Sequence, residues 1–78
     1  MLYNIYGGMP MTTGQLLKKL REEKGWSKNH YAKLRHITHK EIINYENDKV
    51  HPKPERLQHL LKSYRLTIEQ FVKMLDED

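Results

Sequence analysis

Apolar residues recur along this chain at the three- and four-residue spacing of helices, and not at the alternate positions of strands. The clearest stripe is formed by Leu57, Leu60, Leu61 and Tyr64, which share one side of an α-helix. Spacing and flanking residues together predict five helices, over residues 13–24, 28–35, 39–47, 55–64 and 68–75. We therefore expect an all-α fold, built as one compact five-helix domain.

Three of these helices begin with the same local signal, a threonine followed three residues later by glutamine or glutamate. In such a capping box each side chain bonds the other residue's backbone N–H, which satisfies donors left free at a helix start. The pairs are Thr12–Gln15, Thr38–Glu41 and Thr67–Gln70, and Ser27 is the expected cap of the second helix. Gly25 and Pro54 mark the end of the first helix and the start of the fourth.

The apolar faces of the helices also identify candidates for the interior. The aromatic residues Trp26, Tyr31 and Tyr45 are expected to pack there, although each ring is also capable of stacking on a nucleic-acid base. The remaining candidates are Leu16, Leu17, Leu20, Ala32, Leu34, Ile37 and Ile42. In the last helix Ile68, Phe71, Val72 and Leu75 are apolar, and the last three are candidates for exposed apolar contacts.

Residues 1–10 differ from the rest, because an apolar and aromatic stretch is followed by the break Gly7-Gly8. We divide the chain into an N-terminal arm, 1–10, and a folded domain, 11–78. The arm is either a short strand or segment that packs on a partner, or a frayed terminus. A third possibility is that translation starts at Met9 or Met11 and the arm lies upstream of the protein.

The composition narrows the classes of function. The chain has 78 residues and no cysteine, which excludes disulfides and thiolate metal sites. Its net charge of +4 favours nucleic acid or an anionic membrane surface as the binding partner. No apolar run approaches the roughly 20 residues that span a bilayer, and the N-terminus lacks the pattern of a signal peptide. The missing cysteines fit a reducing compartment such as the cytoplasm.

Known catalytic arrangements are missing from the sequence: we find no Ser-His-Asp set, paired carboxylates, glycine-rich phosphate loop or CxxC pair. His36 and His39 have a spacing that metals use, but no third ligand is placed to complete a site. We read His30, His51 and His59 as surface residues. We therefore expect neither an enzyme nor a metal site, and no cofactor.

The stretch from Gly25 to Pro52 carries the most information, since two short helices are joined there by about three residues. One face of the second of these helices is anchored on the core, so its other face points outward. The major groove of B-DNA admits one α-helix, and this outer face is therefore the one that would enter it. On that outer face Asn44 is suited to adenine and Lys40 to guanine. Glu41 either accepts from cytosine N4 or serves only as the capping partner of Thr38.

Within about residues 13–75 the informative pieces are LKKLREEKGWS (17–27), YA (31–32), ITHKEIINYENDK (37–49), HP (51–52) and LTIEQFV (66–72). In this order and spacing they resemble the Cro/repressor-type helix-turn-helix family, also called the xenobiotic-response-element type. The resemblance implies a lambda-repressor-like DNA-binding domain in which the second and third helices read DNA.

The resemblance also implies a role for individual residues. Arg21 and Glu46 match a pair that family members use as a structural ion pair. The implied DNA-binding residues are Lys28 and Asn29 at the start of the second helix, Thr38, His39, Lys40, Glu41 and Asn44 facing the groove, and Asn47, Lys49, His51 and Lys53 along the backbone. The alternative interpretation of the cations among residues 28–53 is a solvated surface without a binding role.

The chain departs from the family pattern at four positions. His36, Asp48 and Arg65 stand where the family usually has glycine. At His36 the turn remains possible with strain, because histidine tolerates left-handed backbone better than most residues. Arg35 stands where the family prefers leucine, so either Leu34 replaces it in the core or the stem of Arg35 packs there.

The expected function is that of a sequence-specific transcriptional regulator of double-stranded DNA. We expect a repressor that binds a pseudo-palindromic operator as a homodimer, formed through the fifth helix or the N-terminal arm. The expected location is the cytoplasm of a bacterium, on the nucleoid, with a bacterial or phage gene as source. Two alternatives remain: an antitoxin or other protein-interaction module, and an adaptor that no longer binds DNA.

Overall fold

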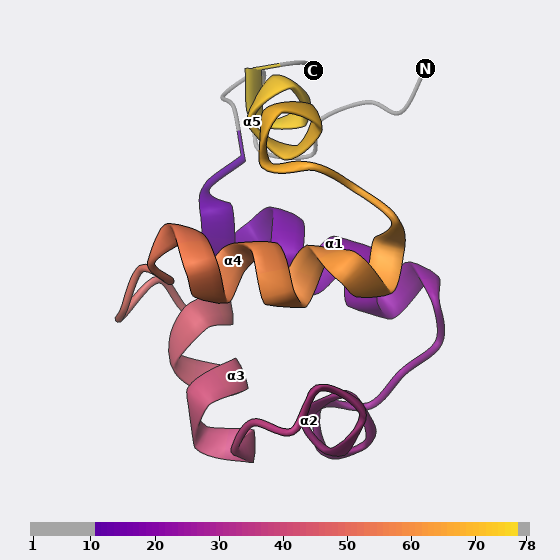
Figure 1. Cartoon of the computed structure of the whole chain (residues 1–78). Helices are drawn as coiled ribbons and strands as arrows, with labels where there is room; N and C mark the ends of the chain where they lie inside the picture. Colours follow the sequence, from indigo (N-terminus) through magenta and orange to yellow (C-terminus); the bar gives the residue numbers. More distant parts are fainter. Residues whose placement is uncertain (1–10, 77–78) are drawn as a thin grey trace.

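A computed structural model of the chain describes residues 11–76 and shows an all-α domain (Figure 1). The helices are α1 (Thr13–Glu23), α2 (Lys28–Arg35), α3 (His39–Glu46), α4 (Pro54–Leu61) and α5 (Ile68–Asp76), with a 3-10 turn, η1 (Lys62–Tyr64), after α4. The five predicted helices are confirmed, and the fourth ends in a tighter 3-10 turn, as helix ends commonly do. The N-terminal arm lies outside the described residues.

The elements pack around one interior, with α2 and α3 at one end of the molecule and α5 at the other (Figure 1). The boxes at Thr12 and Thr67 are complete, because both side chains of each pair bond the other's backbone N–H. The buried apolar residues are Leu16, Leu17, Leu20, Tyr31, Ala32, Ile42, Tyr45, Leu60, Leu61 and Phe71. The expected interior is therefore largely confirmed.

Leu34 was predicted inside and is exposed instead. Phe71 was a candidate for an exposed apolar contact and is buried, because it packs into the interior, whereas Val72 is exposed as expected. Leu34 is 42% exposed and Val72 is 47% exposed. In α2 the inward positions are taken by Tyr31 and Ala32, and Arg35 follows them three and four residues later on the same face. Arg35 therefore occupies the place that a leucine would fill, and Leu34 does not substitute for it.

Arg35 and His59 join the C-terminal ends of α2 and α4 by a reciprocal pair of bonds. The Arg35 guanidinium donates through Nη1 to the His59 carbonyl oxygen at 3.0 Å. The His59 ring lies with Nε2 2.6 Å from the Arg35 carbonyl oxygen, so Nε2 carries the proton. His59 is half-buried and structural, and its assignment as a surface residue is wrong.

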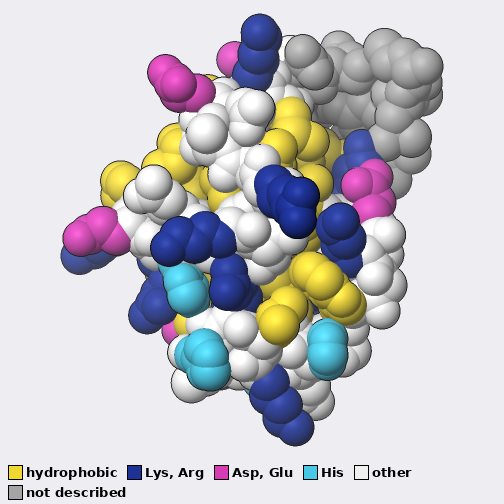
Figure 2. All heavy atoms as spheres, turned by 45° about the vertical axis from the view of Figure 1, so that its right-hand side comes forward, with side chains coloured by type: hydrophobic (Ala, Val, Ile, Leu, Met, Phe, Trp, Pro, Cys, Tyr) yellow, Lys and Arg dark blue, Asp and Glu magenta, His cyan; other side chains and the backbone are white. Residues whose placement is uncertain are grey.

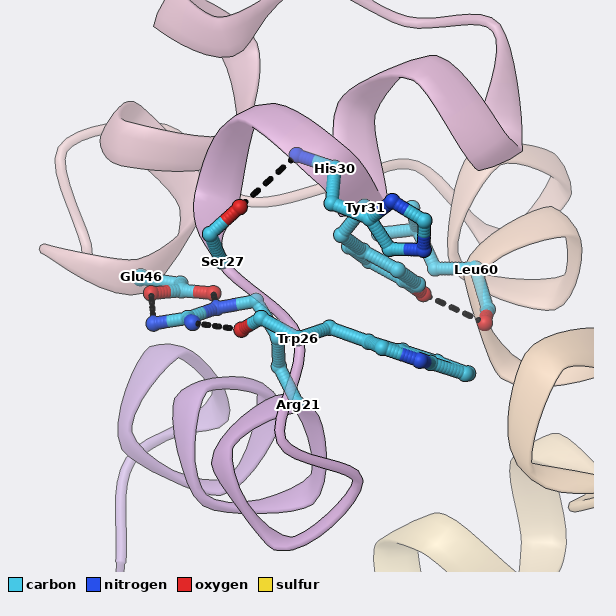
Figure 3. Close-up of polar contacts among 7 residues, drawn as sticks. All are labelled: Arg21, Trp26, Ser27, His30, Tyr31, Glu46 and Leu60. Carbon is cyan, nitrogen blue, oxygen red and sulfur yellow. Dashed lines mark hydrogen bonds and ion pairs between the residues drawn. The ribbon is translucent and has the colours of Figure 1, made fainter.

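The aromatic residues predicted to pack do so. Tyr31 and Tyr45 are buried, and the Trp26 ring is stacked on Tyr31 with centroids 5.6 Å apart. Tyr31 also donates its hydroxyl to the Leu60 carbonyl oxygen at 2.8 Å, which links α2 to α4 (Figure 3). Burial raises the pKa of the Tyr31 phenol. These rings hold the fold together and are not free to stack on bases.

Three non-glycine residues adopt left-handed backbone, at the positions where the family usually has glycine. Their φ angles are 59° at His36, 58° at Asp48 and 55° at Arg65. Such a conformation costs an L-residue roughly 1–2 kcal/mol. Asp48 offsets this cost, because its carboxylate accepts from the Gly14 backbone N–H at 2.9 Å and from the Thr12 hydroxyl at 2.5 Å.

His36→Gly should therefore raise the free energy of unfolding by about 0.5–1 kcal/mol, since the relief of strain exceeds the entropy that glycine adds to the unfolded chain. Urea denaturation followed by circular dichroism measures the change. Asp48→Gly is the matched contrast and should destabilise the domain, because it also removes both bonds to the start of α1. Destabilisation by both variants would contradict strain at His36.

Two features fix α3 against α1. An ideal Cβ built on Gly14 would lie 2.4 Å from the Tyr45 carbonyl oxygen and 2.7 Å from that of Glu46, so the start of α1 approaches the end of α3 as closely as glycine allows. The predicted Arg21–Glu46 ion pair is confirmed, with Nε and Oε2 2.7 Å apart and both side chains buried (Figure 3).

Arg21 also donates through Nη1 to the Trp26 carbonyl oxygen at 2.6 Å, so one side chain holds α1, the loop to α2 and α3. The hydrogen bonds that Arg21 donates to the Glu46 carboxylate raise the pKa of Arg21 above its usual value. Among residues 11–76 no helix has the length and apolar character needed to cross a membrane.

Candidate nucleic-acid interface

The connection between α2 and α3 is a tight turn whose backbone bonds are all local. His36 takes the left-handed conformation at the C-cap of α2, and the Ile37 N–H donates back to the Ala32 carbonyl oxygen at 2.9 Å. Thr38 then caps α3, with its hydroxyl accepting from the Glu41 backbone N–H at 3.0 Å. Two short helices are therefore joined by a short, hydrogen-bonded connection, as the sequence predicted.

The orientation of α3 follows from which of its residues are buried. Ile42, Tyr45 and Glu46 are buried, so the opposite side of the helix faces outward. Residues 38–40 are exposed at its N-terminal end, where the partial positive charge of the helix dipole lies. Asn44 is half-buried, and its side-chain amide makes no hydrogen bond with any other residue in the range 11–76.

Two further sets of predicted site residues flank α3. Lys28 and Asn29 begin α2, which packs against α3; Lys28 is half-buried and Asn29 is exposed. The loop from α3 to α4 carries the other set, all of them exposed: Asn47, Lys49, His51 and Lys53.

The loop is tied to α3 by its backbone, because the Lys49 N–H donates to the Asn44 carbonyl oxygen at 2.9 Å. Lys53 then stands at the N-cap of α4, followed by Pro54 in the first turn as the sequence predicted. His51 and Lys53 line an open hollow together with Glu41 of α3 and Arg56 of α4. The loop and part of α3 therefore border the same hollow.

Glu41 differs from its predicted role as a capping partner. Thr38 supplies its half of the box, but the Glu41 carboxylate turns instead toward α4. Its Oε2 accepts from the Tyr45 hydroxyl at 2.6 Å and pairs with the Arg56 Nε at 2.9 Å. The reason is that an arginine and a phenol offer stronger donors than one backbone N–H. Burial, followed by the bond to Glu41, raises the pKa of Tyr45.

Arg56 was missed by sequence reasoning. The spacing of Glu41 and Tyr45, four residues apart on one helix, contains a signal for their contact. No local pattern connects either of them with Arg56, which lies on another helix fifteen residues beyond Glu41.

Three acidic groups near the candidate interface are compensated by partners, while Glu55, which lines the same hollow, has no ion pair within residues 11–76. Glu46 pairs with Arg21, Glu41 pairs with Arg56, and Asp48 caps the start of α1. On the face drawn in Figure 2, lysine, arginine and histidine side chains spread across the surface and acidic side chains lie mainly at the margins. Such a surface is suited to a polyanion.

The fold and this geometry define an all-α helix-turn-helix domain. The family described as "Helix-turn-helix domain" matches residues 14–76, which is most of the chain, and the chain belongs to this family. This confirms the resemblance to Cro/repressor-type proteins that the sequence motifs indicated.

Two curated relatives are both named HTH-type transcriptional regulator PuuR, one from Escherichia coli (strain K12) and one from Shigella flexneri. Each is 38% identical to this chain over 61 residues, covering 78% of this chain and 33% of the relative. The chain therefore spans about a third of the length of these relatives. No solved structure matches the chain.

Proposed function

We propose that this chain binds double-stranded DNA with sequence specificity and acts as a transcriptional repressor. The observation that carries the proposal is the exposed N-terminal end of α3, which is anchored by Ile42 and Tyr45 and flanked by lysines. The regulators that resemble this chain support it by name. The place of action is the bacterial cytoplasm, where the operator DNA lies, and repression follows from blocking access of polymerase.

Each part of the interface has its own task in this proposal. Lys28, Asn29 and the loop residues Asn47, Lys49, His51 and Lys53 contact phosphates, which set the register of the protein on DNA. The residues of α3 enter the major groove, where Asn44 bonds adenine N6 and N7 and Lys40 donates to guanine. Thr38 and His39 bond phosphate or base edges at the mouth of the groove.

The proposal includes a homodimer, since one reading helix contacts only a few base pairs. The apolar surface for it is α5, where Val72 is 47% exposed and Ile68 and Leu75 are half-buried. The N-terminal arm is the second candidate. A dimer with two-fold symmetry requires half-sites in inverted repeat, separated by about 10 base pairs or a multiple of that spacing.

Selection of bound duplexes from a random DNA pool tests this function directly. We expect a single enriched motif that occurs as an inverted repeat with a fixed spacing, recovered by the purified chain alone. Failure to enrich any sequence at low salt would reject DNA recognition. Enrichment of single half-sites only would reject the homodimer and leave recognition intact.

Asn44→Ala should weaken binding to the selected site by about 1–3 kcal/mol and leave binding to unrelated DNA unchanged, because a base contact is lost. Lys28→Ala is the matched comparison and should weaken binding to every sequence. It should also reduce the dependence of log affinity on log salt by about one, as loss of one phosphate contact requires.

Gel-shift titrations of both variants at several salt concentrations distinguish the two roles. Uniform weakening by Asn44→Ala on all sequences would contradict a base contact. An unchanged salt slope for Lys28→Ala would contradict a phosphate contact, whatever happens to the affinity itself.

A further inference from the structure

We infer that Arg56 of α4 is a specificity-determining residue that acts through Glu41, holding its carboxylate as a fixed acceptor that selects cytosine in the major groove. The inference rests on the proposed function, because it concerns which base the reading helix prefers. Arg56 lies on α4, outside the helix-turn-helix unit of α2 and α3. It is a positioning residue, because it acts on the base only by holding Glu41.

The Glu41 carboxylate is held through one of its two oxygens. Tyr45 and Arg56 both bond the same oxygen of Glu41, Oε2, at 2.6 and 2.9 Å. The second oxygen of this carboxylate makes no bond with any other residue of the described part of the chain. A carboxylate has about four lone-pair sites, so Glu41 retains the capacity to accept from a donor outside the protein.

The two residues that hold Glu41 differ in mobility. Tyr45 is buried and 8% exposed, so its ring is fixed by packing and its hydroxyl is a rigid reference point. The Arg56 side chain is 45% exposed and that of Glu41 is 24% exposed. Both line the same open hollow as His51 and Lys53, which places the ion pair on the side of the molecule proposed to face DNA.

The charge of Arg56 offsets that of Glu41. A lone carboxylate on a surface that meets phosphates is repelled by them and rotates away from DNA. Arg56 balances that charge, which lets Glu41 remain at the interface without opposing the lysines around it. In the major groove cytosine presents the N4 amino donor and guanine presents only acceptors, while adenine presents its N6 donor beside the N7 acceptor, which repels a carboxylate. A fixed carboxylate therefore favours cytosine and disfavours guanine.

The test uses the full chain and duplexes that carry each of the four bases at one operator position. The wild type should prefer cytosine at this position by at least about tenfold. Arg56→Gln should reduce that preference by at least about threefold, and Glu41→Gln should move it toward adenine, the base that glutamine reads. In the Glu41→Gln background, Arg56→Gln should leave the base preference unchanged, because the carboxylate through which Arg56 acts is no longer present.

Two further variants separate positioning from other effects. Tyr45→Phe keeps the packed ring, removes the second donor and should lower the cytosine preference in the same direction as Arg56→Gln. Lys62→Gln is the matched control, since it removes one exposed cation from the other end of α4 and should leave base preference unaltered. Unfolding curves of all variants show that each is folded.

The outcomes distinguish this inference from the function on which it rests. A wild type that binds no duplex at low salt would overturn both. Specific binding without a cytosine preference, or equal weakening on all four duplexes by Arg56→Gln in both backgrounds, would overturn the role of Arg56 alone. In the second case Arg56 is a phosphate contact that acts independently of Glu41.

Discussion

Replacing Arg21 with methionine should lower the free energy of unfolding by about 3–5 kcal/mol, because it leaves the Glu46 carboxylate buried without its partner. The Arg21 and Glu46 side chains are only 7% and 5% exposed, so water cannot solvate the remaining charge. The Trp26 carbonyl loses its donor as well. Domains of this size rarely exceed a stability of about 3–5 kcal/mol, so the variant should be largely unfolded at 25 °C.

Circular dichroism in increasing urea measures this loss, and two companion variants identify its cause. Arg21→Met combined with Glu46→Leu removes both charges and should recover most of the stability, since an apolar pair of similar size replaces the ion pair. Arg21→Lys keeps the charge but cannot form the two parallel bonds to Glu46, which measure 2.7 and 3.0 Å, and should be intermediate. A double variant no more stable than Arg21→Met would contradict an isolated charge as the cause.

Local features of the fold were predictable from sequence because their causes are local. The boxes at Thr12 and Thr67 formed as expected, since a cap involves residues only three apart. The box at Thr38 is the exception, because the Glu41 carboxylate bonds Tyr45 and Arg56 instead. A left-handed turn at His36 was compatible with the sequence, because histidine tolerates this conformation, whereas the same conformation at Asp48 and Arg65 was established only by the structure.

Side-chain partners across helices were less predictable, because they depend on how the helices are placed. The bonds between Arg35 and His59 connect residues 24 apart in the chain, and nothing in either local sequence indicates them. The same holds for Asp48, whose carboxylate caps α1 from 34 residues away. The Arg21–Glu46 pair was foreseen only because a family resemblance carried it.

The candidate site shows the same division between local and long-range causes. Burial of Ile42 and Tyr45 was predicted from spacing, and it determines which positions of α3 face outward. Periodicity places a residue on a face but does not choose its rotamer. The sequence therefore predicts the place of Glu41 on α3, while its turn toward Arg56 emerged only with α4 in place.

Gly14→Ala should lower the free energy of unfolding by about 3 kcal/mol, which is near the upper range for overpacking. The added Cβ would meet the Tyr45 and Glu46 carbonyl oxygens at 2.4 and 2.7 Å and the Asp48 carboxylate at 2.8 Å. The two carbonyls belong to the backbone of the last turn of α3, so relief requires α1 and α3 to separate. Helix propensity acts in the opposite direction, by about 1 kcal/mol at most.

Gly25→Ala is the matched control, because it introduces the same methyl group where space is open. Gly25 has a φ of 75°, and nothing lies within 4 Å of its ideal Cβ, so only the backbone conformation is penalised. We expect a loss of about 1 kcal/mol there, measured by the same urea titration. Equal losses at the two glycines would mean that the contact of α1 with α3 is soft. A larger loss at Gly14 means that this contact fixes the position of the reading helix, and DNA binding by any folded fraction of Gly14→Ala should then weaken on the selected site.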